Sequence, residues 1–412
     1  MDDSSYVLTL YSKYMEQCLT KFMTSDNKTF VQAAQEVLDN TISSRNVDAF
    51  IADIFPVAIS CFTKMALVYQ SEIFKSLKLD EALPDRKEEL KEIKKKVNLQ
   101  NKTIGYSQLY KMIREAMVHT DTDHPNFQFV RPGEFSLKLK PKGQPEIQLF
   151  LSDEEMRTII SVFNFNLGGY MYNFTERPDL QKAVDRKSLN ERNLNEYLKL
   201  EWNGKPVKLD IHQKEAFLNY FYSNNETLNY VYSTGAANSA FFMSRIPFQA
   251  NEYNNFIACL RAGTYLRCLK ENVNMTFLQF EQYYYDFLKI NKVPMQEGVI
   301  VDPYVDVVYN LLISTFGNMA TTVSKDDFCD ILKRGGCKMD VSAANHIRNS
   351  IAHGRFFINH KDDATVEFYD GRNADDLTHI VSFPIGKLNK VLVKQIMAYD
   401  AQLNGEVQEP AR

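Results

Sequence analysis

The stretch from Ala344 to Phe356 reads A-N-H-I-R-N-S-I-A-H-G-R-F, and four residues separate Arg348 from His353. The same spacing occurs far upstream in Y-K-M-I-R-E-A-M-V-H, where Arg114 precedes His119. Both arginines follow an isoleucine, and apolar residues occupy the third and fourth positions after each. Arginine is a permanent cation whose planar fork suits phosphate, and histidine exchanges a proton near neutral pH. Both stretches therefore favour chemistry on a phosphodiester.

Each stretch ends a predicted helix and is followed by the same order of predicted elements. After the first come strands at 127–130, 135–139 and 146–151 and a helix that starts at Ser152. After the second come strands at 355–358, 365–369 and 379–383 and a helix at 385–397. The sequence thus predicts an ancient internal duplication. A third pair at the same spacing, Arg355 and His360, encloses a predicted strand and is treated as unrelated.

The region between the two stretches carries a strong hairpin signal. Asn203-Gly204 separates two strand-like segments at 197–202 and 205–209, and Asn-Gly readily adopts the positive backbone angles of a tight turn. Helices are predicted at 211–222 and 236–245. We expect three parts: an N-terminal domain at 1–165, a connecting region with a hairpin at 166–245, and a C-terminal domain at 246–412.

The arginine-polar-histidine pattern resembles the signature of the HEPN superfamily of helical ribonucleases and related defence and toxin proteins. Arg348-Asn349 to His353 carries the closer match, and Arg114-Glu115 to His119 matches in spacing. The resemblance covers the two flanking thirds of the chain. It implies a mainly α fold with two helical-bundle HEPN-like domains and small β appendages. In that family two motifs face one another across a two-fold axis, so the chain is expected to form an intramolecular pseudo-dimer.

One composite site would then serve RNA cleavage. His353 and His119 are assigned to proton transfer, and Arg348 and Arg114 to phosphate binding and stabilisation of the transition state. Asn349 would support the pocket through hydrogen bonds, with Glu115 as its counterpart.

Composition limits the class of protein and its compartment. With 412 residues, 44% hydrophobic and 24% charged, the chain is typical of a globular protein with two or three domains. No stretch approaches the 18 or more apolar residues of a membrane span, and the acidic start M-D-D-S-S-Y lacks the order of a signal peptide. We therefore expect a cytoplasmic protein without a membrane partner. The net charge of −4 argues against a protein that coats nucleic acid but permits a local basic pocket.

Neither metal nor cofactor is expected. The six cysteines show no C-x-x-C pair and no zinc spacing, so they are predicted to be reduced core residues, and no carboxylate cluster accompanies the motifs.

The leading hypothesis is a metal-independent endoribonuclease that cleaves single-stranded RNA through attack of the 2′-hydroxyl, acting in bacterial toxin or antiviral defence. Its partners would be an RNA substrate and a regulatory protein or antitoxin. DNA is not expected to be a partner. The first alternative is a catalytically silent HEPN scaffold that binds a partner protein or a nucleotide. Glu115 and the net negative charge favour this scaffold, and the intact motif of Arg348 and His353 favours the enzyme. The second alternative, an RNA-guided ribonuclease, fits less well because the chain is short for that task.

Overall fold

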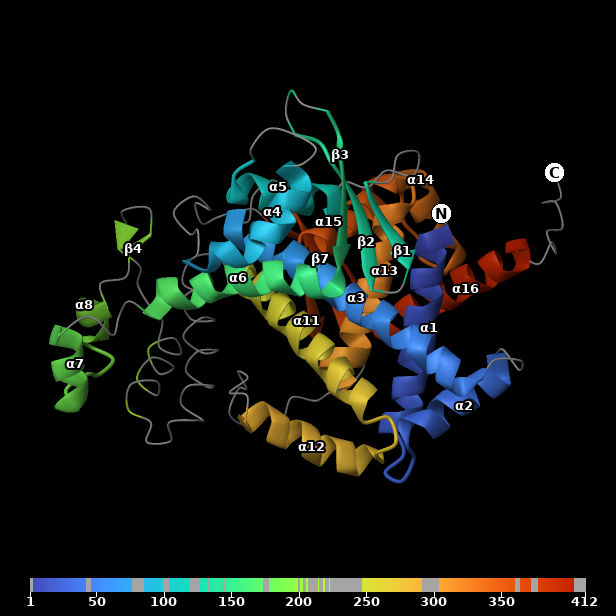
Figure 1. Ribbon diagram of the computed structural model, residues 1–412, viewed down its shortest axis with the longest axis horizontal. Coiled ribbons are helices and arrows are strands. Elements are labelled where there is room, and N and C mark those ends of the chain that lie inside the picture. The colour runs from blue at the N-terminus through green and yellow to red at the C-terminus, as the bar shows by residue number, and fades with distance from the viewer. Residues whose placement is uncertain are drawn as a thin grey trace.

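The computed structural model is mostly helical, with two small sheets on a helical body and a smaller part that extends from it (Figure 1). The residues that it describes are 3–41, 46–75, 85–98, 104–118, 126–172 without 132, 142 and 144, 178–198, 201–202, 205–206, 214, 218, 222, 247–290, 304–359, 364–371 and 377–403. The predicted mainly α class is confirmed.

The first copy of the fold consists of helices around a three-stranded sheet. Its elements are α1 (Asp3–Met23), α2 (Phe30–Thr41), α3 (Val47–Lys75), η1 (Asp85–Leu90), α4 (Lys91–Asn98), α5 (Tyr106–Val118), β1 (Phe127–Arg131), β2 (Glu134–Leu139), β3 (Ile147–Ser152) and α6 (Asp153–Tyr172).

The second copy repeats this order of helices and strands, except that its short helix η2 precedes the long helix instead of following it. Its elements are α11 (Pro247–Glu271), α12 (Phe277–Ile290), η2 (Tyr304–Tyr309), α13 (Asn310–Thr322), α14 (Lys325–Arg334), α15 (Val341–Ala352), β6 (Phe356–Asn359), β7 (Thr365–Asp370), β8 (Thr378–Pro384) and α16 (Ile385–Leu403). The predicted succession of motif helix, three strands and helix is confirmed in both copies. The structure adds corresponding helices before each motif helix, from α1 to α4 and from α11 to α14.

The two sheets share one topology, because each is an antiparallel meander with its second strand in the centre. In the first sheet Leu137 of β2 pairs with Phe127 and Leu149, and all three side chains are buried. In the second, Phe368 of β7 pairs with Phe356 and Val381. Alternate residues of β7 are buried, as expected for a strand with one face on the core.

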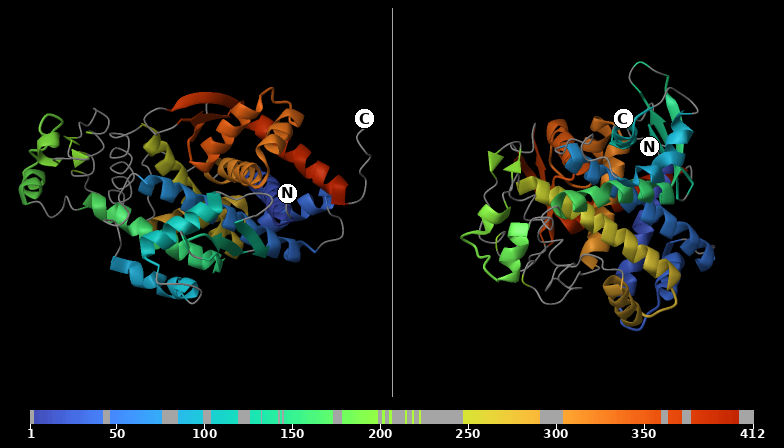
Figure 2. Two further views of the ribbon diagram at one scale, coloured as in Figure 1. Left: turned by 90° about the horizontal axis from the view of Figure 1, so that it is seen from above. Right: turned by 60° about the vertical axis from the view of Figure 1, so that its left-hand side comes forward.

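The connecting region holds α7 (Pro178–Asp185), α8 (Leu194–Leu198) and the strands β4 (Glu201–Trp202) and β5 (Lys205–Pro206). The two strands pair antiparallel, so the predicted hairpin is confirmed, although Asn203 and Gly204 lie outside the described residues. The first strand is shorter than predicted, because Tyr197 and Leu198 belong to α8. The predicted helix at 236–245 and most of that at 211–222 also lie outside them. Figures 1 and 2 show α7, α8 and the hairpin at one end of the molecule, away from the helical body.

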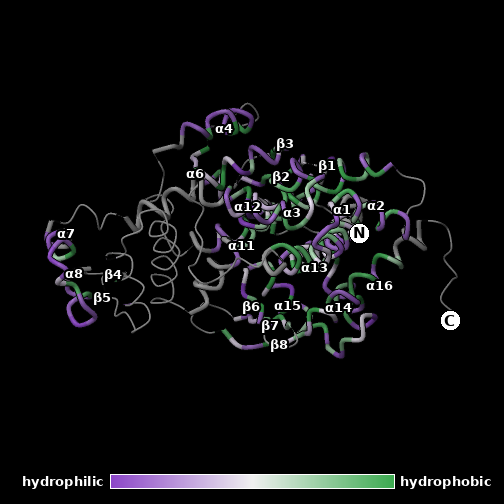
Figure 3. The backbone as a smooth tube through the Cα atoms, turned by 90° about the horizontal axis from the view of Figure 1, so that it is seen from below, coloured by the Kyte–Doolittle hydropathy of each residue, from purple (hydrophilic) through white to green (hydrophobic). Residues whose placement is uncertain are grey.

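One continuous hydrophobic core contains residues of both copies. Helix α3 packs against α11, and α1 packs against α3 and α13. In Figure 3 the central helix α13 is largely hydrophobic, whereas α4 and α7 at the surface are largely hydrophilic. Pro56 lies inside α3, so the helix neither starts nor ends there.

Contrary to the expectation that no stretch approaches a membrane span, the segment Val47–Glu72 in α3 is long and apolar enough to cross a membrane, and 83% of its most apolar window is buried inside the protein. A core helix passes the same test of length and composition. All six cysteines are buried and free, in agreement with the sequence prediction. Burial raises the pKa of the Cys61 and Cys268 thiols to about 11, so both stay protonated near neutral pH.

The corresponding helices α3 and α13 also share a short sequence. Ile59 to Ala66 reads I-S-C-F-T-K-M-A, and Ile313 to Ala320 reads I-S-T-F-G-N-M-A, with five of eight residues identical. Most of the shared side chains are in the core. This match extends the predicted duplication to the helices that precede the motifs.

Candidate functional site

The C-terminal part of α3 is the element around which the two motifs meet. Tyr110 and Arg114 lie four residues apart on α5, so they share the face that this helix presents to α3. The Tyr110 hydroxyl donates a hydrogen bond of 2.9 Å to Gln70 of α3. Arg114 donates to the carboxylate of Glu72, two residues further along α3. Burial raises the pKa of Tyr110 well above its ordinary value, so it remains a neutral donor.

The second motif reaches α3 through a close backbone contact at the end of α15. His353 caps this helix, and Gly354 follows with a φ of +68°. A Cβ atom on Gly354 would lie 2.7 Å from a ring carbon of Tyr69, so only glycine fits here. Asn255 of α11 donates hydrogen bonds to the carbonyls of Gly354 and Phe356, at 3.0 and 3.1 Å. These contacts fix His353 beside the next turn of α3.

Glu72, Arg114 and His353 form what we call the Glu72 centre. The Nδ1 atom of His353 lies 2.9 Å from Oε2 of Glu72, which is an ion-pair distance, although the two atoms are not aligned as a hydrogen bond. The other carboxylate oxygen, Oε1, accepts from Arg114. The side chain of Glu72 is only 4% exposed, that of Arg114 8%, and that of His353 26%. The centre is therefore a buried carboxylate and guanidinium with a partly accessible imidazole beside them.

The Glu72 centre brings together one predicted residue from each motif. Arg114 comes from the first motif and His353 from the second. Arg348 lies on α15 and is half-buried. It lies five positions before His353, which is a rotation of about 140° on a helix, so the two side chains leave α15 in different directions. His119 lies outside the described residues.

The two predicted supporting residues have different surroundings. Asn349 donates a hydrogen bond of 3.1 Å to Asp370 of β7, which ties α15 to the second sheet. Glu115 is half-buried, its side chain is 46% exposed, and it lies 3.9 Å from Lys111 on the same helix. Glu115 therefore forms a surface ion pair with Lys111 and does not contact the Glu72 centre.

Asp370 joins several polar side chains near the second motif. Its carboxylate lies 2.8 Å from Nδ1 of His346 and 3.6 Å from Arg355, in addition to the bond from Asn349. The Asp370 side chain is 7% exposed and that of His346 is 47% exposed. Arg355 of the third arginine–histidine pair thus forms an ion pair with Asp370, and Phe356–Asn359 forms the expected strand. His360 lies outside the described residues.

Sequence reasoning missed both carboxylates that organise this region, Glu72 and Asp370. Glu72 follows a long apolar run in α3, and a charged residue there is seldom fully buried unless it is paired. That rule predicts a cationic partner but does not say which one. Asp370 ends a strand of alternating burial, where its buried position could be read from the pattern.

Within the described part of the chain, no group of three or more His, Cys, Asp or Glu side chains is arranged to hold a metal ion. Comparisons with protein families, with curated proteins and with solved structures found no match for the chain.

Proposed function

We propose that the protein is a metal-independent endoribonuclease that cleaves single-stranded RNA at a composite site made by two HEPN-like halves of one chain. The observation that carries the proposal is the convergence of Arg114 and His353 on Glu72. Arg114 belongs to the first motif and His353 to the second, and a composite site requires residues of both motifs to lie close together.

Contacts between corresponding residues support the pseudo-dimer. At a two-fold axis a residue meets its own equivalent, and reciprocal pairs of elements pack together. Thr29 before α2 and Thr276 before α12 form an antiparallel bridge. Lys64 and Asn318 are equivalent in the shared sequence of α3 and α13, and Lys64 donates a hydrogen bond of 2.6 Å to Asn318. In the same way α1 packs against α13, and α11 packs against α3.

The proposed chemistry starts at His353. Because Nδ1 faces the Glu72 carboxylate, Nε2 is the nitrogen that would take the proton from an RNA 2′-hydroxyl. The 2′-oxygen then forms a bond to phosphorus, the bond from phosphorus to the 5′-oxygen breaks, and the leaving oxygen takes up a proton. The products are a 2′,3′-cyclic phosphate and a 5′-hydroxyl. His119 stays the candidate for protonating the leaving oxygen, and Arg348 for binding the phosphate.

The role proposed for Arg114 differs from the one expected from the sequence. Its side chain is 8% exposed and donates to Glu72, so phosphate could reach it only if this pair opened. We propose instead that Arg114 balances the charge of Glu72, which in turn orients His353. Arg114 and Glu72 are then positioning residues, and His353 and Arg348 are the catalytic ones.

A silent HEPN scaffold that binds a partner protein or a nucleotide is the second candidate. One observation favours it: the arginine of the first motif is used inside the protein. A regulatory protein or antitoxin remains a proposed partner under either function.

Cleavage of end-labelled single-stranded RNA in EDTA separates the two candidates. We expect cleavage of RNA but not of DNA of the same sequence, because DNA lacks the 2′-hydroxyl, and products that end in a cyclic phosphate. The variant His353→Ala should lose this activity, whereas His379→Ala should keep it, since His379 is an exposed residue that contacts Ser382 on β8. Equal cleavage of DNA, or loss of activity in EDTA, would contradict the mechanism. A folded protein that leaves RNA intact would favour the scaffold.

A further inference from the structure

A cavity of about 690 Å³ lies between α1, α13 and the start of α16. This volume is in the range of small-molecule sites, which is about 300–1,000 Å³. The apolar part of its wall includes Val308 of η2 and Leu312 of α13, and the first turn and a half of α16, including Lys387 and Lys390, forms another part. We call this space the α16 cavity.

Positively charged side chains outnumber negatively charged ones among the described residues around the α16 cavity. Glu16 lines it, but its carboxylate accepts a hydrogen bond from the buried Lys13, which also donates to Asn389 of α16. Among the described residues, neither Lys387 nor Lys390 forms an ion pair. The nitrogen of Lys387 lies over the ring of Phe383, 5.7 Å from its centroid. Within the described part of the chain, two positive charges of the lining are therefore left without a carboxylate.

The backbone adds to this positive field. The first turn of α16 contains no acidic residue, and a helix N-terminus carries a partial positive charge. Gly386, in that turn, faces open space, since a Cβ atom added to it would meet nothing within 4 Å. An anion could thus approach the backbone closely at this point.

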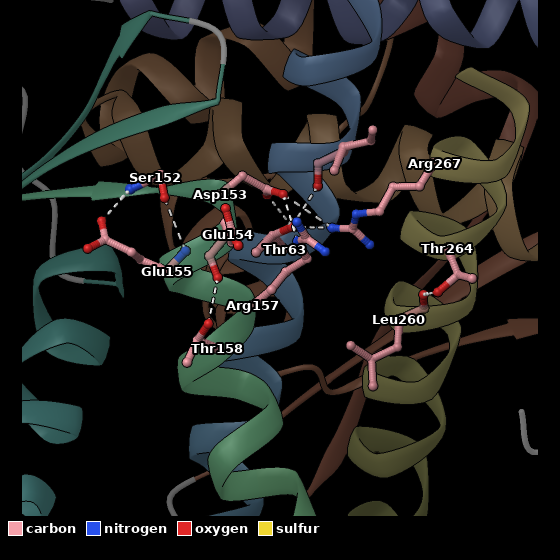
Figure 4. A network of polar contacts seen from close by, with 11 residues as sticks. Thr63, Ser152, Asp153, Glu154, Glu155, Arg157, Thr158, Leu260, Thr264 and Arg267 are labelled. Atoms are coloured by element: carbon pink, nitrogen blue, oxygen red, sulfur yellow. Dashed lines mark hydrogen bonds and ion pairs between the residues drawn. The ribbon is translucent and has the colours of Figure 1, made fainter. Parts of the chain in front are cut away.

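The corresponding helices of the first copy enclose a carboxylate of the protein itself (Figure 4). Asp153, the first residue of α6, accepts hydrogen bonds from Thr63 of α3 at 2.6 Å and from Arg267 of α11 at 3.3 Å. Arg157 of α6 adds a third at 3.1 Å. The helices α11, α3 and α6 correspond to α1, α13 and α16. Where the first copy has an internal anion held by three donors, the second has a cavity lined by lysines.

We propose that the α16 cavity binds a small phosphorylated molecule with an apolar or aromatic body, the chemical class of the mononucleotides. Lys387, Lys390 and the start of α16 hold the phosphate, and the wall of Val308 and Leu312 packs against the rest. None of the residues of the Glu72 centre lines this cavity. The inference is thus independent of the ribonuclease proposal, and each can fail alone.

Isothermal titration calorimetry of the full chain tests this site with each of the four ribonucleoside 5′-monophosphates, with adenosine and with inorganic phosphate. We expect at least one monophosphate to bind more tightly than phosphate alone, and adenosine to bind at least about tenfold more weakly than AMP if AMP is bound. The reason is that charge-assisted hydrogen bonds to phosphate contribute most to recognition. Binding should weaken as salt rises.

Three variants locate the binding. Lys387→Glu reverses a charge of the lining and should weaken the affinity about tenfold or more. Ala364→Phe should reduce it by filling space at a lining position. Lys394→Glu is the matched control, because Lys394 is on the same helix but donates to the carbonyl of Arg334 and does not line the cavity. Its affinity should stay within about twofold of the parent, with all melting temperatures measured.

Three results would overturn the proposal. The first is that none of the four monophosphates binds the folded parent. The second is that phosphate or adenosine binds as tightly as the best monophosphate. The third is that Lys387→Glu and Lys394→Glu reduce affinity equally, since the effect would then come from overall charge and not from this cavity.

Discussion

The two motif helices, α5 and α15, carry the same arginine–histidine spacing in different environments. On α5 the arginine is buried and joined to Glu72. On α15 the arginine is half-buried, and the histidine at the helix end is 26% exposed. The same spacing in sequence therefore places Arg114 in a buried ion pair, whereas Arg348 and His353 are both partly exposed. The spacing alone does not tell which residue can meet a ligand.

The difference arises in the preceding long helices. Helix α3 continues to Lys75 and carries Glu72 into the contact with both motifs. Helix α13 ends at Thr322, and Ser324 caps the new helix α14. When the shared sequences of α3 and α13 are aligned, Glu72 corresponds to Asp326, which is exposed in the first turn of α14. In the described residues, the second copy thus provides no buried carboxylate at that position, and one centre forms in place of two.

The largest expected effect concerns His353, the partly exposed histidine of the second motif. Replacing His353 by Ala should lower the rate of RNA cleavage by about 10²- to 10⁴-fold, the usual contribution of a general acid or base. Single-turnover rates at saturating protein would measure it, beside a thermal melt. Unchanged cleavage with a collapsed melting temperature would identify His353 as a structural residue.

A smaller but still large effect is expected for the buried carboxylate. Glu72→Ala leaves the Arg114 guanidinium buried without its partner, and breaking such a pair typically costs about 3–5 kcal/mol of unfolding free energy. Urea denaturation of this variant and of Asp326→Ala makes the comparison between the copies. The exposed Asp326 should cost much less, and equal losses would remove the distinction between the two helices.

The two arginines should differ in their tolerance of lysine. Arg114→Lys keeps the charge but loses the planar fork in a buried pair, and we expect a loss of about 1–3 kcal/mol in unfolding free energy. Arg348→Lys, at a half-buried position, should cost less than about 1 kcal/mol and lower the cleavage rate instead. A larger loss of stability for Arg348→Lys than for Arg114→Lys would contradict this division of roles.

The residue that follows each arginine should have the smallest effect. Glu115→Gln removes only a surface pair with Lys111 and should change the unfolding free energy by no more than about 0.5 kcal/mol. Asn349→Ala removes a hydrogen bond to the buried Asp370, for which about 1 kcal/mol is typical. If Glu115→Gln were the more damaging of the two, its side chain would have an interior role that its exposure does not indicate.

Much of the fold could be predicted from sequence because it depends on local patterns. Alternating apolar residues and the turn residues between them located both sheets, and helical periodicity located α5, α15 and α16. The longer duplication could not be predicted from the motifs, because it involves the helices that precede them. The match between Ile59–Ala66 and Ile313–Ala320 lies in apolar helices, where similar residues are common.

The candidate site was less accessible to sequence reasoning because its partners are far apart in the chain. The arginine–histidine spacing identified Arg114 and His353, but nothing local indicates that they share Glu72. That contact depends on how α5 and the end of α15 pack on α3, and in particular on the approach of Gly354 to Tyr69. The assignment of Arg114 to phosphate binding came from its residue type, which does not report its burial.

A double-mutant cycle of unfolding free energy tests whether the two copies meet at Glu72. The cycle uses Glu72→Gln, His353→Asn and the double variant, measured by urea denaturation at fixed pH and salt. Residues in contact typically give an interaction energy of about 0.5–3 kcal/mol, and we expect a value in this range for Glu72 and His353. Losses that add to within about 0.3 kcal/mol would mean that His353 and Glu72 do not interact, and the composite centre would be contradicted.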